Sequence, residues 1–251
     1  KRWLLVKRAF DTTTPLDELL KTWYEACCGK EAAPYLKAYY DLWEDFWTGA
    51  AVRETPWYKL SMTGESGYAY LNDKTYLYAV TPELLAKGTA LMSNVVAKAT
   101  ASGDADQKIR AERLRDFNDF YVARSLAAGV GFAAGAKGIR TPEEALDFLA
   151  VYPRLVREGA RAQECVKKVV APMVSERWFG CYAGERFDSL YLAKRLPAET
   201  AENPNLATWT AQASRFADDP RARAAMLKTG APVFRAVLSG DALAASENYL
   251  W

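Results

Sequence analysis

Gly29-Lys-Glu-Ala-Ala-Pro-Tyr-Leu-Lys-Ala-Tyr-Tyr-Asp-Leu-Trp-Glu-Asp-Phe-Trp47 is the stretch of this sequence that decides the fold. Its glycine is suited to end one helix, and its Ala-Ala-Pro is suited to begin the next, because proline is favoured in a first helical turn. Apolar residues then recur three and four positions apart, which is the period of a helix with one buried face. These residues are Leu36, Tyr39, Trp43 and Phe46. The stretch predicts a helix over 31–47 that follows a helix over 15–28.

Thr-Pro pairs mark further helix starts at Thr14, Thr81 and Thr141. A threonine side chain can accept a bond from a free first-turn amide, and proline at the first position gives up no hydrogen bond. Asp17 and Glu144 each stand three residues after such a threonine and complete predicted capping boxes. The remaining predicted helices cover 3–10, 82–101, 105–127, 142–170 with a kink at Pro153, and short segments within 205–250.

Residues 49–80 are predicted to form one long loop that is rich in aromatic rings. Strand-like alternation is weak and confined to 68–80, where a short hairpin is an alternative. Long connections are commonly functional or disordered, and this composition is too aromatic for disorder. The expected fold is therefore all-α, an irregular multi-helix bundle with one long aromatic loop. We expect a single helical domain over 1–251, with a sub-boundary near 128–140 as the alternative division.

Two interpretations of the aromatic loop stay open. Tyrosine and tryptophan rings stack on the apolar faces of sugars while their polar edges bond hydroxyl groups, so the rings are candidates for carbohydrate or partner contact. Alternatively, they cover the helical core. Tyr68 and Tyr70 are two positions apart, as are Tyr76 and Tyr78, so on extended backbone the two rings of each pair would lie on the same face. The candidate rings are Trp57, which lies beside Pro56 and is the first choice, and Tyr58, Tyr68, Tyr70, Tyr76 and Tyr78.

Composition excludes several classes of function. The chain has 251 residues, half of them apolar, and 33 Lys and Arg against 31 Asp and Glu, so its net charge of +2 gives no reason to expect nucleic acid as a partner. It has no histidine, which excludes histidine-based catalytic triads and zinc sites within it. The longest uncharged run, Ser125–Ala136, is about half of the ~20 residues that span a bilayer. We expect no metal, no cofactor and no membrane span.

Four cysteines are present, at Cys27, Cys28, Cys165 and Cys181. Neighbouring residues on a helix point about 100° apart, which does not suit a disulfide between the first two. The other two could pair only if a turn brings their Cα atoms to roughly 6 Å. Buried free thiols are the favoured interpretation, because unpaired cysteine is among the most buried residue types.

The remaining motifs have structural explanations. The run Gly129–Gly135 has the wrong spacing for a dinucleotide fingerprint and follows a helix instead of a strand. The acid pairs Glu44-Asp45 and Glu143-Glu144 lie on helix surfaces and cannot flank a glycosidic bond across a cleft. The arginines at 110, 113 and 115 alternate with acids, which indicates ion pairs along a helix. No residue of this chain is therefore predicted to be catalytic.

The first half of the chain resembles the C-terminal part of the bacterial family DUF 4838, over roughly residues 3–125. That family is similar to glycoside hydrolases of the α-glucuronidase type, in which a catalytic (β/α)₈ barrel precedes a helical region. The segments that carry the resemblance are Trp3-Leu4-Leu5-Val6-Lys7, Asp11, Leu16-Asp17-Glu18-Leu19-Leu20, Trp23-Tyr24 and the Gly29 stretch as far as Trp43.

The resemblance implies that the barrel and its catalytic carboxylates lie upstream of this chain, since such residues sit at the C-terminal face of a barrel. It also implies an extracytoplasmic location and contacts with the barrel, a glycan or a second copy. We therefore expect a piece of a longer protein whose helices 3–10 and 15–28 expose an apolar surface and promote association. The alternative is a stand-alone helical glycan-binding or scaffold protein. The gene sequence upstream of Lys1 would distinguish these two possibilities: an in-frame barrel supports the first, and a start codon or signal peptide supports the second.

Overall fold

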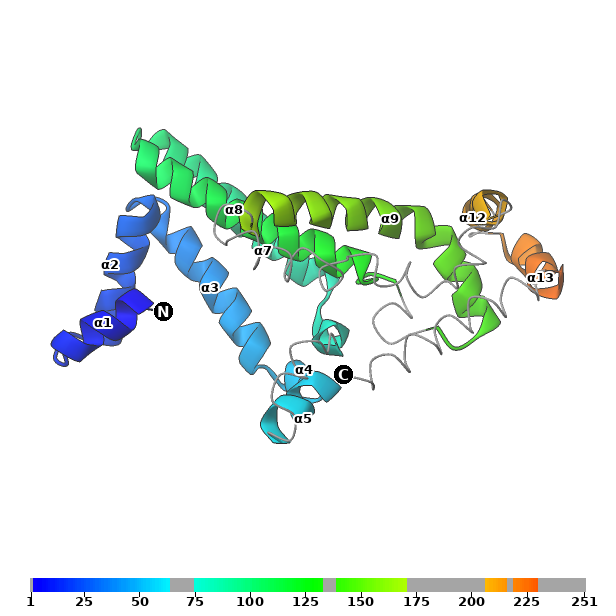
Figure 1. Ribbon diagram of the computed structural model, residues 1–251, viewed down its shortest axis with the longest axis horizontal. Coiled ribbons are helices and arrows are strands. Elements are labelled where there is room, and N and C mark those ends of the chain that lie inside the picture. Colours follow the sequence, from blue (N-terminus) through cyan, green and yellow to red (C-terminus); the bar gives the residue numbers. More distant parts are fainter. Residues whose placement is uncertain (1, 64–74, 133–138, 171–205, 216–218, 230–251) are drawn as a thin grey trace. The chain divides into compact units, whose positions relative to one another are not determined.

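The computed structural model describes residues 2–63, 75–132, 139–170, 206–215 and 219–229 (Figure 1). Within these ranges every regular element is a helix and none is a strand, which confirms the predicted all-α class. The elements are α1 (Arg2–Phe10), α2 (Leu16–Cys28), α3 (Ala33–Thr48), α4 (Ala50–Arg53), α5 (Pro56–Thr63), the 3₁₀ helix η1 (Thr75–Ala79), α7 (Pro82–Ala101), α8 (Ala105–Ala127), α9 (Pro142–Val170), α12 (Leu206–Arg215) and α13 (Pro220–Thr229).

The chain divides into two compact units, each with its own buried core. Lys1–Gly49 and Glu83–Asp119 make up the first unit, and Ala50–Pro82 and Phe120–Trp251 the second. The expectation of one domain, and of a sub-boundary near 128–140, stays a prediction.

The core of the first unit is assembled from α2, α3, α7 and α8. α2 packs on α3, and Leu36 of the predicted α3 stripe is fully buried between them and α7. Asn118 of α8 donates from its amide to the Thr89 hydroxyl of α7 at 3.3 Å. The remaining buried members of this core are Tyr24, Cys28, Ala32, Ala33, Met92, Val95, Ala99 and Ala111.

Gly29 makes the turn from α2 to α3 because its backbone takes a conformation that other residues rarely adopt. Its φ is +93°, its N–H donates to the Glu25 carbonyl at 2.9 Å, and its own carbonyl accepts from the Ala33 amide at 2.9 Å. A Cβ at this position would collide with the side-chain oxygen of Gln107 on α8. The turn therefore requires glycine for its backbone angle, whereas a shift of the flexible Gln107 side chain can relieve the contact with a Cβ.

Arg110 of α8 holds the end of α2. Its guanidinium donates to the Cys27 carbonyl at 2.7 Å and to the Ala26 carbonyl at 3.2 Å, two of the last four carbonyls of α2, which lack partners inside that helix. The sequence had predicted an ion pair along α8 for this arginine. The prediction was wrong because it considered only neighbours on the same helix.

The two predicted capping boxes had different outcomes. At α9 the box is confirmed: the Thr141 hydroxyl accepts from the Glu144 amide at 3.2 Å, and the Glu144 carboxylate accepts from the amides of Arg140 and Thr141 at 2.7 and 3.1 Å. At α2 it is wrong. The Thr14 hydroxyl donates to Asp11 at 2.5 Å, so it is engaged in the turn from α1, and α2 begins without a side-chain cap.

The second unit has its core beneath α9, a 29-residue helix that contains Pro153. Figure 1 shows this helix changing direction along its length, as expected where a proline ring displaces the backbone of the preceding turn. α12 packs against α9, and the Ser214 hydroxyl donates to the Ala150 carbonyl at 2.9 Å. Arg223 of α13 pairs with Asp147 of α9 at 2.7 Å. The core cluster consists of Ile139, Ala145, Leu146, Phe148, Leu149, Leu155 and Ala213.

The prediction of one long loop over 49–80 was wrong for its described parts. They form α4, α5 and η1, and the backbone over 75–79 is a 3₁₀ helix, so no part of the suggested hairpin over 68–80 is seen among the described residues. The signal for α5 was present in the sequence. Thr55-Pro56 is a Thr-Pro pair like those that mark the other predicted helix starts, and Pro56 is the first residue of α5.

Candidate functional site

The candidate site is the aromatic region formed by α5 and η1, which contact each other in the second unit. Thr75 of η1 accepts a hydrogen bond from the Trp57 amide of α5 at 2.7 Å. The ring of Trp57 meets the ring of Tyr76 edge to face, with centroids 5.9 Å apart and planes at 72°. This arrangement is favoured for aromatic pairs because the positive edge of one ring faces the negative face of the other.

Tyr76 is the buried base of the region. It is only 7% exposed, and the guanidinium of Arg124 on α8 lies 6.0 Å from its ring centroid, within the range of a cation–π contact. Burial raises the pKa of the Tyr76 phenol above its ordinary value, and the nearby arginine opposes this effect. Tyr76 is therefore neutral at physiological pH and acts as a packing residue in this unit.

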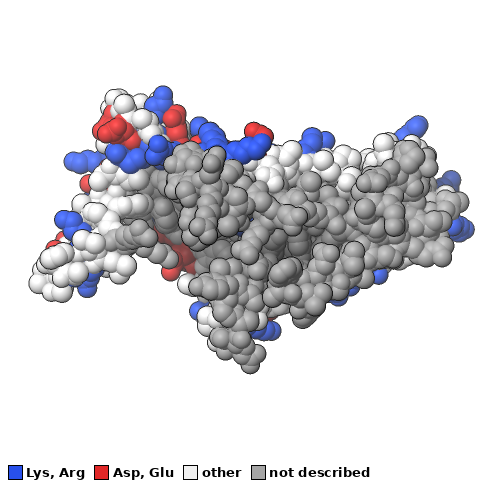
Figure 2. All heavy atoms as spheres, viewed as in Figure 1, with Lys and Arg blue, Asp and Glu red and all other residues white. Residues whose placement is uncertain are grey.

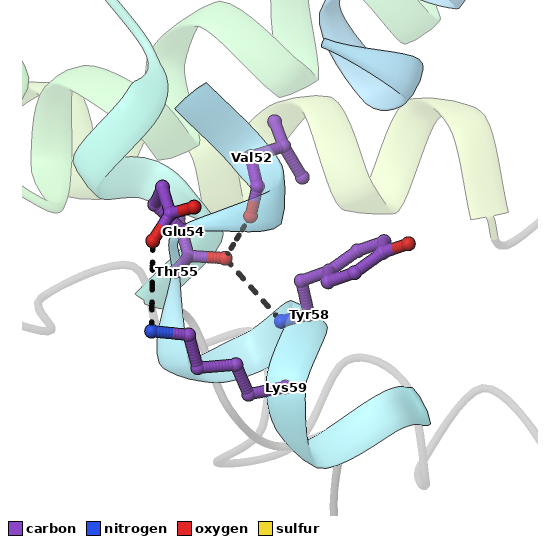
Figure 3. A network of polar contacts seen from close by, with 5 residues as sticks. All are labelled: Val52, Glu54, Thr55, Tyr58 and Lys59. Carbon is purple, nitrogen blue, oxygen red and sulfur yellow. Dashed lines mark hydrogen bonds and ion pairs between the residues drawn. The ribbon is translucent and has the colours of Figure 1, made fainter. Parts of the chain in front are cut away.

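Thr55 fixes the start of α5 and so the position of Tyr58. Figure 3 shows the buried Thr55 hydroxyl between two backbone groups, donating to the Val52 carbonyl at 2.6 Å and accepting from the Tyr58 amide at 3.3 Å. The Tyr58 ring points away from this network and is partly exposed. Glu54 and Lys59 lie 3.7 Å apart beside it, and both are largely exposed.

Tyr78 differs from Tyr76 in its surroundings. The sequence had predicted that these two rings share one face of an extended segment. In a 3₁₀ helix, with three residues per turn, positions two apart point in different directions, and Tyr78 is 36% exposed where Tyr76 is buried. The described rings thus comprise the packed pair Trp57 and Tyr76, the partly exposed Tyr58, and the exposed Tyr78. Tyr68 and Tyr70 lie outside the described residues.

A second series of rings runs through α2 and α3 in the first unit. Trp23 meets Tyr40 with ring centroids 5.6 Å apart, and Trp43 meets Phe46 at 5.6 Å. Burial raises the pKa values of Tyr39 and Tyr40 to about 12, so both phenols stay neutral. The sequence placed Tyr39, Trp43 and Phe46 on the inward face of α3, and all three are partly buried. It made no assignment for Tyr40 and Trp47, which remain more than a third exposed.

The thiols of Cys27 and Cys28 lie at the end of α2, beside Arg110. A hydrogen bond from the Cys28 thiol lowers the pKa of Cys27 to about 7, against the opposing effect of burial, and the charge of Arg110 adds to the lowering. The same bond, together with burial, raises the pKa of Cys28 well above its ordinary range. Cys27 and Cys28 are free, as predicted, and of the two only Cys28 is fully buried. Cys181 lies outside the described residues, so the pairing of Cys165 stays open.

The described helices and turns offer neither a cluster of metal ligands nor a membrane-spanning helix. No group of three or more Cys, Asp or Glu side chains in the described part of the chain is placed to hold a metal ion. No helix in the same part is long and apolar enough to cross a bilayer. Comparison with known proteins found no family model, no curated protein and no solved structure that matches the chain.

Proposed function

We propose that this chain is a non-catalytic helical accessory domain of a bacterial carbohydrate-active protein, of the glycoside-hydrolase type that its first half resembles. In this proposal the domain packs against an upstream catalytic barrel and contributes to glycan contact or to a dimer. The observation that carries the proposal is the aromatic region of α5 and η1. There, the Trp57 ring packs on the buried Tyr76 ring, while Tyr58 is partly exposed and Tyr78 is 36% exposed.

The chemistry of these rings suits a saccharide. A tyrosine ring offers an apolar face to the C–H groups of a sugar and a phenol that can donate or accept at a hydroxyl group. Each ring stacked on a sugar should contribute about 0.5–1.5 kcal/mol, by analogy with ring pairs in proteins. One or two rings therefore support weak binding, on the order of millimolar.

The test compares exposed and packed rings in the same chain. Tyr58→Ala and Tyr78→Ala should each weaken oligosaccharide binding by about two- to tenfold while the melting temperature stays within a degree or two. Trp57→Ala should instead lower the melting temperature by several degrees, because it removes the ring that packs on Tyr76. Titration by NMR against neutral and uronic-acid oligosaccharides gives the affinities. Binding that is unchanged in both tyrosine variants would remove glycan contact from the proposal.

The non-catalytic part of the proposal has its own assay. The pure chain should not hydrolyse aryl-glycosides, because no pair of carboxylates placed across a cleft can be identified in its sequence. Turnover that is abolished by replacing one Asp or Glu of this chain would show that it is an enzyme. Full turnover that survives every such replacement would point to a contaminating hydrolase and leave the proposal standing.

A further inference from the structure

We propose that α1 is a membrane-surface helix that lies on anionic lipid with its apolar face. The helix exposes Leu5, Val6 and Phe10 to 70, 58 and 90%. These are among the most exposed large apolar side chains in the described part of the molecule. Such exposure on one short helix marks an interaction surface. The proposal goes beyond the accessory function and is an alternative to the expectation that a protein partner covers residues 3–10.

The exposed apolar residues share one face of α1. At 100° per residue, Leu5, Val6, Ala9 and Phe10 fall within an arc of about 140°. Trp3 and Leu4 are partly buried, and α1 contacts α2. The apolar face therefore remains open after α1 has packed on the rest of its unit.

Positive charge borders this face on both sides. Lys7 and Arg8 each lie about 130° from the centre of the apolar arc, one on either side. Arg2, two turns before Ala9, falls near the centre of the arc by the same geometry and adds a positive charge at the start of the helix. Figure 2 shows the region at the left, where α1 and α2 lie in Figure 1, as mostly white spheres with scattered blue and red ones. Lysine and arginine in this position can keep their charge at the headgroups while the apolar face enters the acyl boundary. The Trp3 ring, with the Lys7 ammonium 5.9 Å from its centroid, is also typical of a membrane interface.

The positive charge of residues 1–10 favours anionic lipid over a protein partner as the surface that covers the apolar face of α1. Residues 1–10 contain four Lys and Arg and no Asp or Glu, although the whole chain is nearly neutral at +2. Two copies of α1 packed face to face would bring like charges together, which disfavours a dimer through this helix. An anionic bilayer attracts each Lys or Arg near its surface by about 1 kcal/mol. A bilayer also needs no complementary shape, so a helix of only nine residues can bind to it.

Arg8 also fixes the end of α1. Its guanidinium donates to the Thr14 carbonyl at 2.8 Å, and Asp11 accepts from the Thr13 and Thr14 amides at 3.1 and 2.9 Å. These bonds hold the linker between α1 and α2 in one conformation. The helix is thus presented in a defined orientation, and the other donors of the Arg8 guanidinium stay available for phosphate groups.

The experiment measures sedimentation of the whole chain with vesicles. One set contains phosphatidylcholine and phosphatidylglycerol in roughly equal amounts, and the other contains phosphatidylcholine alone. The chain should bind the first set, bind the second at least about tenfold more weakly, and be released by salt, which screens the headgroup charge.

Three variants test the roles of the residues. Leu5→Asp with Phe10→Asp should weaken binding to the anionic vesicles by at least about tenfold, and Lys7→Gln by about fivefold. Ile109→Asp, on an exposed apolar residue of α8, is the matched control and should leave binding unchanged. Circular dichroism should be the same for all four proteins, because every replaced residue is exposed.

Several results would overturn the proposal. The proposal is wrong if the chain binds neither set of vesicles or binds both sets equally. It is also wrong if Ile109→Asp weakens binding as much as the α1 variants do. If the α1 variants instead change only the oligomeric state in light scattering, a protein surface covers this face and the lipid proposal is wrong. Tyr58→Ala and Tyr78→Ala should keep vesicle binding, so failure of the glycan proposal can be distinguished from failure of this one.

Discussion

At the scale of single residues, the roles in this protein depend on partners that lie far away in the chain. Arg110 and Cys27 are separated by 83 positions, yet the guanidinium caps the helix that ends beside this thiol. The charge of Arg110 and the hydrogen bond from Cys28 together make Cys27 unusually acidic. A partly exposed thiol with a pKa of about 7 is about half in its reactive thiolate form at pH 7.

Alkylation of Cys27 should follow a titration with a midpoint near pH 7. The measurement uses a chain in which Cys165 and Cys181 are replaced by Ser, with iodoacetamide as the reagent and mass spectrometry to locate the label. Cys28→Ala should move the midpoint up toward the ordinary value of 9.0, because it removes the hydrogen-bond donor to the thiolate. Cys28→Ser keeps a donor and should move the midpoint less. A midpoint in Cys28→Ala that equals the midpoint of the parent chain would show that the Cys28 thiol does not lower the pKa of Cys27.

Two glycines should respond to alanine in opposite ways. Gly88 lies inside α7, and an added Cβ would make ordinary contacts with Trp43 at 3.4 Å, so Gly88→Ala should stabilise the protein by about 0.5–1 kcal/mol. Gly29→Ala should destabilise it by more than about 1 kcal/mol, since its φ is +93° and Gln107 occupies the space. Urea unfolding of the two variants measures both effects. A loss of stability in Gly88→Ala would mean that α7 and α3 pack more tightly than the contacts indicate.

At the scale of elements, several helices begin where a local polar side chain accepts bonds from their free amides, and α2 and α3 begin without one. The Thr141 box caps α9, Asp104 accepts from the Asp106 and Gln107 amides at the start of α8, and Asp219 does the same for α13. α2 lacks such a cap because Asp11 engages Thr14. These bonds hold the pKa of the Asp11 carboxyl well below its ordinary range, the hydroxyl of Thr14 being the largest cause.

The capping box of α9 can be tested with two adjacent glutamates. Glu144→Ala should lower the free energy of unfolding by about 1 kcal/mol more than Glu143→Ala, because only Glu144 accepts bonds from the Arg140 and Thr141 amides. Both residues lie in the first turn of α9 and lose a comparable interaction with the helix dipole. The comparison therefore isolates the cap. Equal losses measured by urea unfolding would assign the effect to the dipole alone.

At the scale of the whole molecule, the main feature is that apolar burial is divided between two clusters that share no residue. Leu36 belongs to the cluster of the first unit and Phe148 to that of the second, and both are fully buried. α8 contributes residues to both units. Stability is therefore expected to respond to each core separately.

Replacing one core residue in each unit should give additive effects. Leu36→Ala should cost about 2–5 kcal/mol and Phe148→Ala about 3–5 kcal/mol, because each leaves a cavity in a packed cluster. The double variant should lose the sum to within about 0.5 kcal/mol, as is usual for residues without shared partners. Urea unfolding followed by circular dichroism measures all three proteins. A coupling free energy above about 1 kcal/mol would show that the two cores do not act independently.

The sequence by itself determined most of the described helices, though not α4, α5 and η1, since helix starts and periods depend on residues within a few positions of one another. It predicted α8 with the bounds Ala105–Ala127, and the start of α9 at Pro142 with its capping box. The start of α5 could have been predicted from Thr55-Pro56 in the same way.

Only the tertiary structure decided which side chains are available for function. Tyr76 and Tyr78 look alike in the sequence, but one is buried beneath Arg124 and the other is exposed. Arg110 resembles its neighbours along α8, but it alone among them donates to the carbonyls at the end of α2 in the described structure. Burial and long-range hydrogen bonds depend on residues brought together from distant parts of the chain. Local spacing does not carry that information.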